Sequence, residues 1–468
     1  MSLKKGSEVT LEIVDAAFKG KGVGKVEGIA VFVPGTAPGD VVRARIINRK
    51  KSHKEAKLLK ILEPSPDRIE PKCSHANVCG GCSWQHIPYE KQVEYKGKQV
   101  RDHVERIGGL TDTRVHPALP NDKAFYYRNK MEYSFSTRRW LTEEEINSDE
   151  FVDDSAFAAG LHAPGRFDKI LNLRECHLQD PRSFEILNFV RSYAIKHEIP
   201  AFDTMAKTGF FRHLVIRNSH FTDDFMVNVV SYSWNEARIT HLKNELLKAF
   251  PFITTIVNNV NDQPNPTAVG RYEKLLHGPG FIRDRIGEYE FRINANAFFQ
   301  TNTAQAEKLY QIARDFAELN TGDTLFDLYC GVGTLSLFMS GAAEQVVGIE
   351  LADVAIKNAQ KNAKENEVSN VHFVKGDMKE VFGPELVETY GRPDVLITDP
   401  PRAGMHPDVV QRLCELRVPR MVYVSCNSST LARDLAILSE VYDIPEVQPV
   451  DMFPQTYHVE AVAKLVLK

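Results

Sequence analysis

The sequence predicts an α/β protein of several domains, with a Rossmann-like, doubly wound sheet in its C-terminal part. Beyond about residue 300, short apolar runs alternate with helical stretches, which is typical of a mostly parallel sheet covered by helices. Residues 1–64 show short alternating runs between glycines, a pattern that favours a small β-barrel of the OB type. Because 468 residues exceed what one core usually holds, we expect three domains, at 1–64, 69–290 and 291–468.

Composition indicates a folded chain whose overall charge favours no particular partner. Hydrophobic residues make up 43% and charged residues 26%, which excludes the weakly apolar, highly charged class of disordered proteins. With a net charge of −4, binding to a nucleic acid would depend on local basic patches. No apolar run approaches the roughly 18 residues of a membrane span, and seven cysteines without a signal peptide indicate a reducing compartment. We therefore expect a cytoplasmic monomer without a membrane segment.

The first 64 residues place strands at Val9–Val14, Ile29–Val33 and Val41–Ile46. The late half of this region is strongly basic. Glu55 is the one acidic residue among its cations, which are Arg43, Arg45, Arg49, Lys50, Lys51, Lys54, Lys57 and Lys60. Such a run is either a solvated face or a surface that follows nucleic-acid phosphates. The segment 63–68 indicates a linker.

A cysteine cluster marks the central region, which has a mixed α+β pattern. Cys73, Cys79 and Cys82 fall within ten residues, and Gly80 and Gly81 allow the chain to wrap a small object. Structural zinc sites and iron–sulfur clusters are commonly bound by four thiolates, and Cys176 is the best candidate for the fourth ligand, remote in sequence from the other three. The spacing does not separate the two metals, and unliganded cysteines in a core are the alternative.

Two further features of the central region concern its surface. Tyr126–Lys130 and Phe210–His213 interleave aromatic and basic residues, which suits either stacking on nucleotides or an aromatic strand core. The acidic stretch Thr142–Asp154 indicates an exposed loop or insertion.

The C-terminal region has the pattern of a nucleotide-type cofactor pocket. Its predicted strands lie at Thr324–Tyr329, Val346–Ile349, Val371–Val374, Asp394–Thr398, Met421–Val424 and Ala461–Leu467. The first strand leads into the glycine-containing segment 330–334, where the backbone can approach a ligand at a helix N-terminus. Glu350 ends the second strand, where a carboxylate can accept ribose hydroxyls, and Asp377 after the third can contact an adenine amino group. This spacing fits S-adenosylmethionine (SAM) better than NAD, although both acids could instead be helix N-caps.

The ends of the remaining strands supply candidate catalytic groups. Asp399 precedes two prolines, which fix the direction of the chain there, and Arg402 stands where N-methylating enzymes commonly carry an aromatic residue. Cys426 follows the fifth strand, and a thiolate both attacks and leaves readily, as methylation of uracil C5 through an adduct at C6 requires. Glu460 is a candidate base for the C5 proton.

The motifs of this chain, taken together, closely resemble those of the RNA m5U methyltransferase family of the RumA/RlmD type. They are Phe298-Phe-Gln-Thr-Asn302, Asp327-Leu-Tyr-Cys-Gly-Val-Gly333, Asp399-Pro-Pro-Arg-Ala-Gly404, Ser425-Cys-Asn427, Thr430-x-Ala-Arg-Asp434 and His458-Val-Glu460. The likeness covers nearly the whole chain. It departs from the family at Ser428, where relatives usually have proline, and in the acidic insertion at 142–154.

The resemblance implies a class I SAM-dependent methyltransferase domain, an N-terminal TRAM barrel and a specific set of site residues. Cys426 would be the nucleophile and Glu460 the base, while Gln300, Tyr329, Glu350 and Asp399 would contact cofactor or substrate. We also place Thr334 and Asp377 in the cofactor pocket, although the family varies at Asp377. The four cysteines would hold a [4Fe-4S] cluster, with zinc as the alternative.

The expected partner is RNA, with 23S rRNA favoured because tRNA-specific relatives typically lack the barrel and the cysteine cluster. The target uracil should leave its stack to reach Cys426. A uridine in tRNA is the alternative substrate, and two other activities are also considered. Cytosine-5 methylation typically uses a Pro-Cys nucleophile on the fourth strand, where this chain has Pro400 and Pro401 and no cysteine. A catalytically inactive iron–sulfur RNA-binding module is disfavoured by Gln300, Asp399, Cys426 and Glu460.

Overall fold

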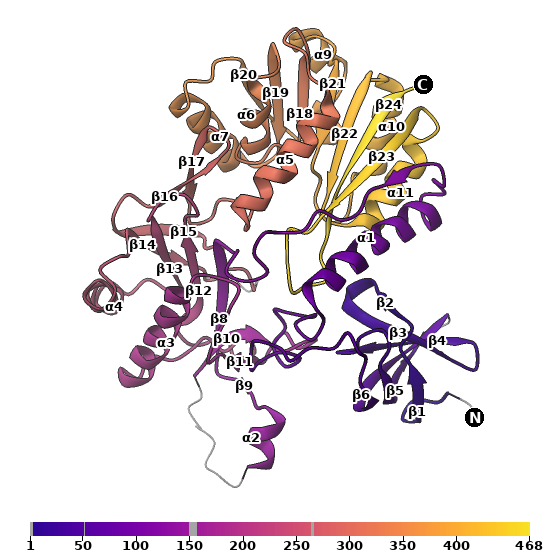
Figure 1. The fold of residues 1–468 in the computed structure, drawn as a ribbon. Helices are drawn as coiled ribbons and strands as arrows, with labels where there is room; N and C mark the ends of the chain where they lie inside the picture. Colours follow the sequence, from indigo (N-terminus) through magenta and orange to yellow (C-terminus); the bar gives the residue numbers. More distant parts are fainter. Residues whose placement is uncertain (1–2, 51, 149–156, 264–265) are drawn as a thin grey trace.

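The computed structural model describes residues 3–50, 52–148, 157–263 and 266–468, and Figure 1 shows their arrangement. In these ranges the strands form a six-stranded sheet, two eight-stranded sheets and a two-stranded hairpin. None of the described helices is long and apolar enough to cross a lipid bilayer.

The N-terminal sheet curls into the expected barrel. It contains β1 (Glu8–Glu12), β2 (Asp15–Ala17), β3 (Lys21–Val26), β4 (Ile29–Pro34), β5 (Val41–Arg49) and β6 (His53–Glu63), with a 3-10 turn at Phe18–Gly20. The strand order is β1-β5-β6-β4-β3-β2, and the Val14 N–H donates to Val23 O (2.9 Å), which brings the end of β1 to β3. A Cβ at Gly24 would lie 2.1 Å from Glu12 O, so only glycine permits this approach.

The central sheet is built from eight strands and is covered on one face by two helices. The strands are β8 (Lys130–Ser136), β9 (Arg139–Trp140), β10 (Ala158–His162), β11 (Ile170–Asn172), β12 (Phe211–Asn218), β13 (Phe225–Ser231), β14 (Thr255–Val260) and β15 (Tyr272–His277). Their order is β15-β14-β13-β12-β8-β10-β11-β9. Helices α3 (Pro181–Lys196) and α4 (Glu236–Ala249) pack on one face of the sheet through a shared apolar core (Figure 1).

Two features of the central region can now be placed. Phe210 and Phe211 are buried in this apolar core, so the segment 210–213 belongs to the aromatic strand core rather than to a stacking surface. The acidic stretch begins with the short helix α2 (Glu143–Asn147), which is capped by Thr142. Its remainder, at 149–154, lies outside the described residues.

The C-terminal sheet has the predicted doubly wound form. Its strands are β18 (Thr324–Leu328), β19 (Gln345–Glu350), β20 (Val371–Lys375), β21 (Val395–Thr398), β22 (Arg420–Ser425), β23 (Tyr442–Val450) and β24 (Glu460–Leu467). The order is β20-β19-β18-β21-β22-β24-β23, and every pairing from β20 to β22 is parallel, whereas β24 runs antiparallel to β22 and β23. All six strands expected here are confirmed, and β23 is an addition.

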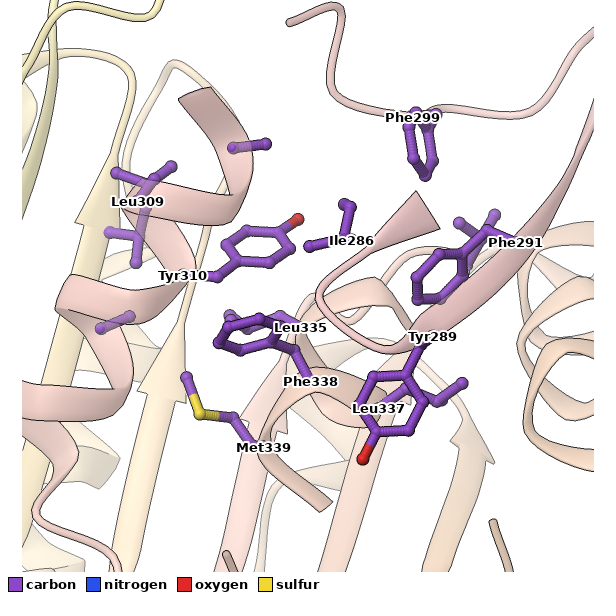
Figure 2. Close-up of a cluster of buried hydrophobic side chains, with 14 of the residues drawn as sticks. Ile286, Tyr289, Phe291, Phe299, Leu309, Tyr310, Leu335, Leu337, Phe338 and Met339 are labelled. Atoms are coloured by element: carbon purple, nitrogen blue, oxygen red, sulfur yellow. The ribbon is translucent and has the colours of Figure 1, made fainter. Parts of the chain in front are cut away.

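Helices cover both faces of this sheet. One core includes α5 (Thr303–Ala317), α6 (Thr334–Ser340) and part of α7 (Asp353–Glu365), and the other includes α8 (Met378–Val381), α9 (Pro384–Tyr390), α10 (Pro407–Leu416) and α11 (Ser428–Leu438). The hairpin β16 (Phe281–Ile286) and β17 (Tyr289–Asn294) adds Tyr289 and Phe291 to the first core, beside Tyr310 and Phe338 (Figure 2).

A segment from the region between the barrel and the central sheet joins the C-terminal sheet. Strand β7 (Arg114–Val115) pairs with β23 as the eighth strand of this sheet, and helix α1 (Tyr89–Arg106) contributes Val100 and Val104 to its second core. The sequence patterns assign residues 89–115 to the expected central domain, 69–290. In the structure these residues pack on the C-terminal sheet, so the C-terminal domain is built from two separate parts of the chain.

Candidate active site

The loop after β18 has the backbone geometry of a cofactor-binding loop. Tyr329, Gly331 and Gly333 all have positive φ, and Gly333 directly precedes α6, whose N-terminus therefore points to the loop. A Cβ at Gly331 would meet no heavy atom within 4 Å, whereas one at Gly333 would meet Phe373 at 2.8 Å. Gly331 thus faces open space that a ligand can enter, and Gly333 is needed for packing.

The two acids predicted to bind the cofactor differ in their surroundings. Glu350 lies at the end of β19 beside the glycine loop, because its Oε2 accepts from the Gly331 N–H (3.2 Å) and its Oε1 from the Ala352 N–H (2.8 Å). Asp377 is the N-cap of α8, where its carboxylate accepts from the Lys379 N–H (3.0 Å). Burial and then the Asp377 and Asp434 carboxylates raise the pKa of Tyr329 to about 12.

Tyr310 connects three of the other predicted residues. Its hydroxyl is hydrogen-bonded to Thr334 Oγ1 (2.9 Å), and it lies near Gln300 and Asp399, since both groups influence its pKa, which burial raises. Gln300 is itself buried. Sequence reasoning missed Tyr310 because a tyrosine on the apolar face of a helix has no signal that distinguishes it from a core residue.

Cys426 and Glu460 are brought together by the antiparallel pairing of β22 and β24. Ser425 is the register partner of Ala461, so the next residue along one strand, Cys426, lies opposite Glu460 at the start of the other. Asp399 follows β21, the neighbour of β22, and its N–H donates to Leu328 O (3.4 Å) at the end of β18. The thiol and both carboxyl groups therefore lie at the edge of the sheet that carries the glycine loop.

These three groups influence one another's protonation. Burial raises the pKa of the half-buried Cys426 to about 11, and the Glu460 and Asp399 carboxylates add to this shift. Burial, and then Asp399, raises the pKa of Glu460 to about 8, and burial raises that of Asp399 to about 7. Because each carboxylate disfavours negative charge on the thiol, a cation placed among them would favour the ionised form of all three.

Arg402 supplies one such cation. Its guanidinium lowers the pKa of both Cys426 and Glu460, against the larger effect of burial. Its backbone is tied to the turn after Cys426, since Asn427 Nδ2 donates to Arg402 O (3.0 Å). The sequence showed Arg402 in the position of an aromatic residue, but only the structure places it beside the thiol.

The four predicted metal ligands also converge. Cys79 and Cys82 are both affected electrostatically by Cys73 and Cys176, although burial is the main reason that the pKa of each rises to about 12. The Gly81 N–H donates to Cys79 Sγ (3.3 Å). All seven cysteines are free thiols. No group of three or more His, Cys, Asp or Glu side chains in the described ranges has the geometry that holds a single metal ion.

The fold and the site together define a class I SAM-dependent methyltransferase. The central parallel strands, the antiparallel β24, the glycine loop before α6 and the acid at the end of β19 are the defining features. Similarity to known protein families supports this assignment. A profile described as tRNA (Uracil-5-)-methyltransferase matches residues 281–467, and a TRAM domain profile matches residues 3–59.

The chain belongs to the RNA (uracil-5-)-methyltransferase family. It is 42% identical over 465 residues to an uncharacterized RNA methyltransferase of Chlorobaculum tepidum, covering 98% of this chain and 96% of that one. It is also 42% identical over 456 residues to an uncharacterized RNA methyltransferase of Bacteroides thetaiotaomicron, covering 97% and 100%. The crystal structure of Pyrococcus abyssi tRNA (uracil-54, C5)-methyltransferase with S-adenosyl-L-homocysteine superposes with a TM-score of 0.74 at 30% identity, covering 98% of this chain and 100% of that one.

Proposed function

We propose that this enzyme methylates C5 of a uridine in RNA, with 23S rRNA as the favoured substrate and tRNA as the alternative, and with Cys426 as the nucleophile and Glu460 as the base. The observation that supports this most strongly is the pairing of β22 with β24, which sets a thiol opposite a buried carboxyl group at the cofactor edge of the sheet. Cytosine-5 methylation is less well supported, because its nucleophile is expected on the fourth strand. Here β21 is followed by Asp399-Pro400-Pro401, which contains no thiol.

Each residue has a defined part in this reaction. The Cys426 thiolate forms a bond to C6, and the electrons of the C5–C6 double bond move into an enolate that makes C5 nucleophilic. Bound SAM would supply the methyl group that C5 acquires, and would leave as S-adenosylhomocysteine once its bond from sulfur to the methyl carbon is broken. Glu460 then takes the C5 proton, the bond between Sγ and C6 breaks, and the double bond is restored as the thiolate leaves. In this proposal the cofactor and the target base would be contacted by Gln300, Tyr329, Thr334, Glu350, Asp377 and Asp399.

The electrostatics of the site fit this sequence of steps. A thiol with a pKa of about 11 and a base with a pKa of about 8 are both largely protonated at neutral pH. The positive charge of a sulfonium, added to that of Arg402, would lower both values and favour the thiolate and the carboxylate. The reactive ionisation states would therefore form mainly once the cofactor is in place.

The barrel supports binding to RNA. On β5 and β6, Arg43 lies directly opposite Lys60 and Arg45 opposite Lys57, and all four side chains are exposed. Arg45 is partly compensated by its ion pair with Glu8 (2.8 Å). Like charges in directly opposite positions still destabilise a sheet, so a polyanionic partner explains this arrangement better than stability does. It suits the phosphates of a folded RNA.

Loss of the gene is expected to remove one 5-methyluridine from 23S rRNA. The parent gene should restore it and Cys426→Ala should not, because the sulfur that bonds to C6 is then missing. Mass spectrometric mapping of rRNA and tRNA nucleosides measures this, and Cys414→Ala, a change at a half-buried cysteine on α10, is the matched control. Loss of the modification from tRNA instead would reassign the substrate, and unchanged nucleosides in both RNAs would refute the activity.

We further propose that Cys73, Cys79, Cys82 and Cys176 hold a [4Fe-4S] cluster. Four thiols that affect one another electrostatically, with a backbone N–H donating to one sulfur, support this group, and zinc is the alternative. Anaerobic reconstitution should give equal amounts of iron and sulfide and broad visible absorbance. Cys176→Ser should lose both signals and Cys414→Ser should keep them, whereas binding of zinc alone would contradict the proposal.

A further inference from the structure

Helix α1 touches both of the chain segments that carry the proposed catalytic residues. It packs against α11, β7 and β23, and it lies outside the residues that match the methyltransferase and TRAM profiles. The turn with Cys426 leads into α11, and the loop 451–459 leads into β24 with Glu460. A helix in contact with both segments can fix the thiol relative to the carboxyl group.

At its C-terminal end, α1 contacts the turn after Cys426 through His103. His103 Nδ1 and Ser428 Oγ are 2.9 Å apart, and Ser428 is only 1% exposed. Burial lowers the pKa of His103, so the imidazole is neutral at neutral pH and the bond is between two neutral groups. Ser428 is two residues after Cys426, so its contact with His103 anchors the end of the turn that carries the thiol.

Ser428 occupies a backbone position that suits proline. It is the first residue of α11, where the N–H has no partner within the helix and proline is favoured. The preceding Asn427 is extended (φ −144°, ψ 95°), as the residue before a proline should be. A proline there would stiffen the turn by itself, whereas serine leaves the turn to be held by neighbouring groups. His103 is such a neighbour.

Towards its N-terminal end, α1 holds the loop before Glu460. Lys96 Nζ donates to Asp451 Oδ1 (2.6 Å) and to Phe453 O (3.0 Å), and both charged side chains are fully buried. Gln92 exchanges two hydrogen bonds with Gln455, which has a positive φ of 69°. The loop backbone is therefore fixed from α1 over several residues before β24 begins.

We propose that α1 is a positioning element for the reaction, in which the bond between His103 and Ser428 holds the turn of Cys426. The inference rests on the proposed function only for the identity of the catalytic groups. His103 acts through Ser428 and is a positioning residue, not a catalytic one. Its loss should leave the thiol and the carboxyl group chemically intact but allow the turn that carries the thiol to move.

The test compares His103→Ala with the parent protein, using RNA that contains 5-fluorouridine. Adduct formation should slow by about fivefold, the effect of one lost hydrogen bond between neutral groups, with unchanged affinity for SAM and RNA. His103→Asn retains a hydrogen-bonding group near the position of Nδ1 and should recover most of the rate. Glu105→Ala, an exposed change on the same helix, is the matched control.

Hydrogen exchange separates this inference from the proposed function. The Thr430 and Leu431 N–H groups both donate to Asn427 O, so they report on the turn whether or not RNA reacts. They should exchange faster in His103→Ala, and this difference should vanish in a Ser428→Pro background. Unchanged exchange in His103→Ala would overturn the positioning role. Absence of any adduct in the parent would refute the Cys426 mechanism alone.

Discussion

Replacing Glu460 with glutamine is expected to trap a methylated covalent complex between the enzyme and its RNA. Glutamine has nearly the same shape but cannot accept the C5 proton, so the thiolate cannot leave after methyl transfer. Turnover should fall by roughly 100- to 10,000-fold, the usual contribution of a positioned base. Denaturing electrophoresis with RNA and methyl-labelled SAM would show labelled protein–RNA complex in Glu460→Gln and little in the parent.

The burial of Glu460 supports the expectation that the adduct accumulates. Its side chain is only 6% exposed, so a water molecule cannot easily replace the carboxylate as proton acceptor. Glu440→Gln makes the same chemical change at an exposed position of the same domain and should turn over normally. Normal turnover in Glu460→Gln would remove this residue from the role of base.

Replacing Lys96 with methionine is expected to destabilise the protein by about 3–5 kcal/mol, the usual cost of leaving one partner of a buried ion pair alone. Asp451 would lose its ion-pair partner in a fully buried position, and one of its oxygens already has no hydrogen-bond partner. Thermal and urea unfolding of the full chain would measure the loss. Adding Asp451→Asn should recover part of it, because the uncompensated charge is then removed.

Lys98→Met on the same helix is the matched control. Lys98 also bonds to carboxylates, those of Asp15 and Asp102, but it is 43% exposed, and such pairs contribute less than about 1 kcal/mol. If Lys96→Met cost no more than Lys98→Met, the buried pair would not be what holds the loop before Glu460.

Local sequence patterns were sufficient for the strands that carry the site. The runs ending near Tyr329, Glu350, Asp399 and Cys426 are mostly apolar, as is typical of strands buried on both faces, and all four strands are confirmed. Strand β23 was not predicted, because Pro445 and Pro449 interrupt its apolar pattern. The structure accommodates Pro445 where the register of β23 with β24 shifts, an irregularity at which proline is tolerated.

The sequence by itself determined the fold class, the family and the residue types at each strand end, since these depend on local periodicity and motif spacing. Only the tertiary structure decided which of these groups meet. The register of β22 with β24 sets Cys426 opposite Glu460. The fold also brings α1 into contact with Ser428 and Asp451, which lie more than 300 residues later in the sequence. Such contacts depend on strand pairing and side-chain packing between distant segments, for which a linear pattern has no signal.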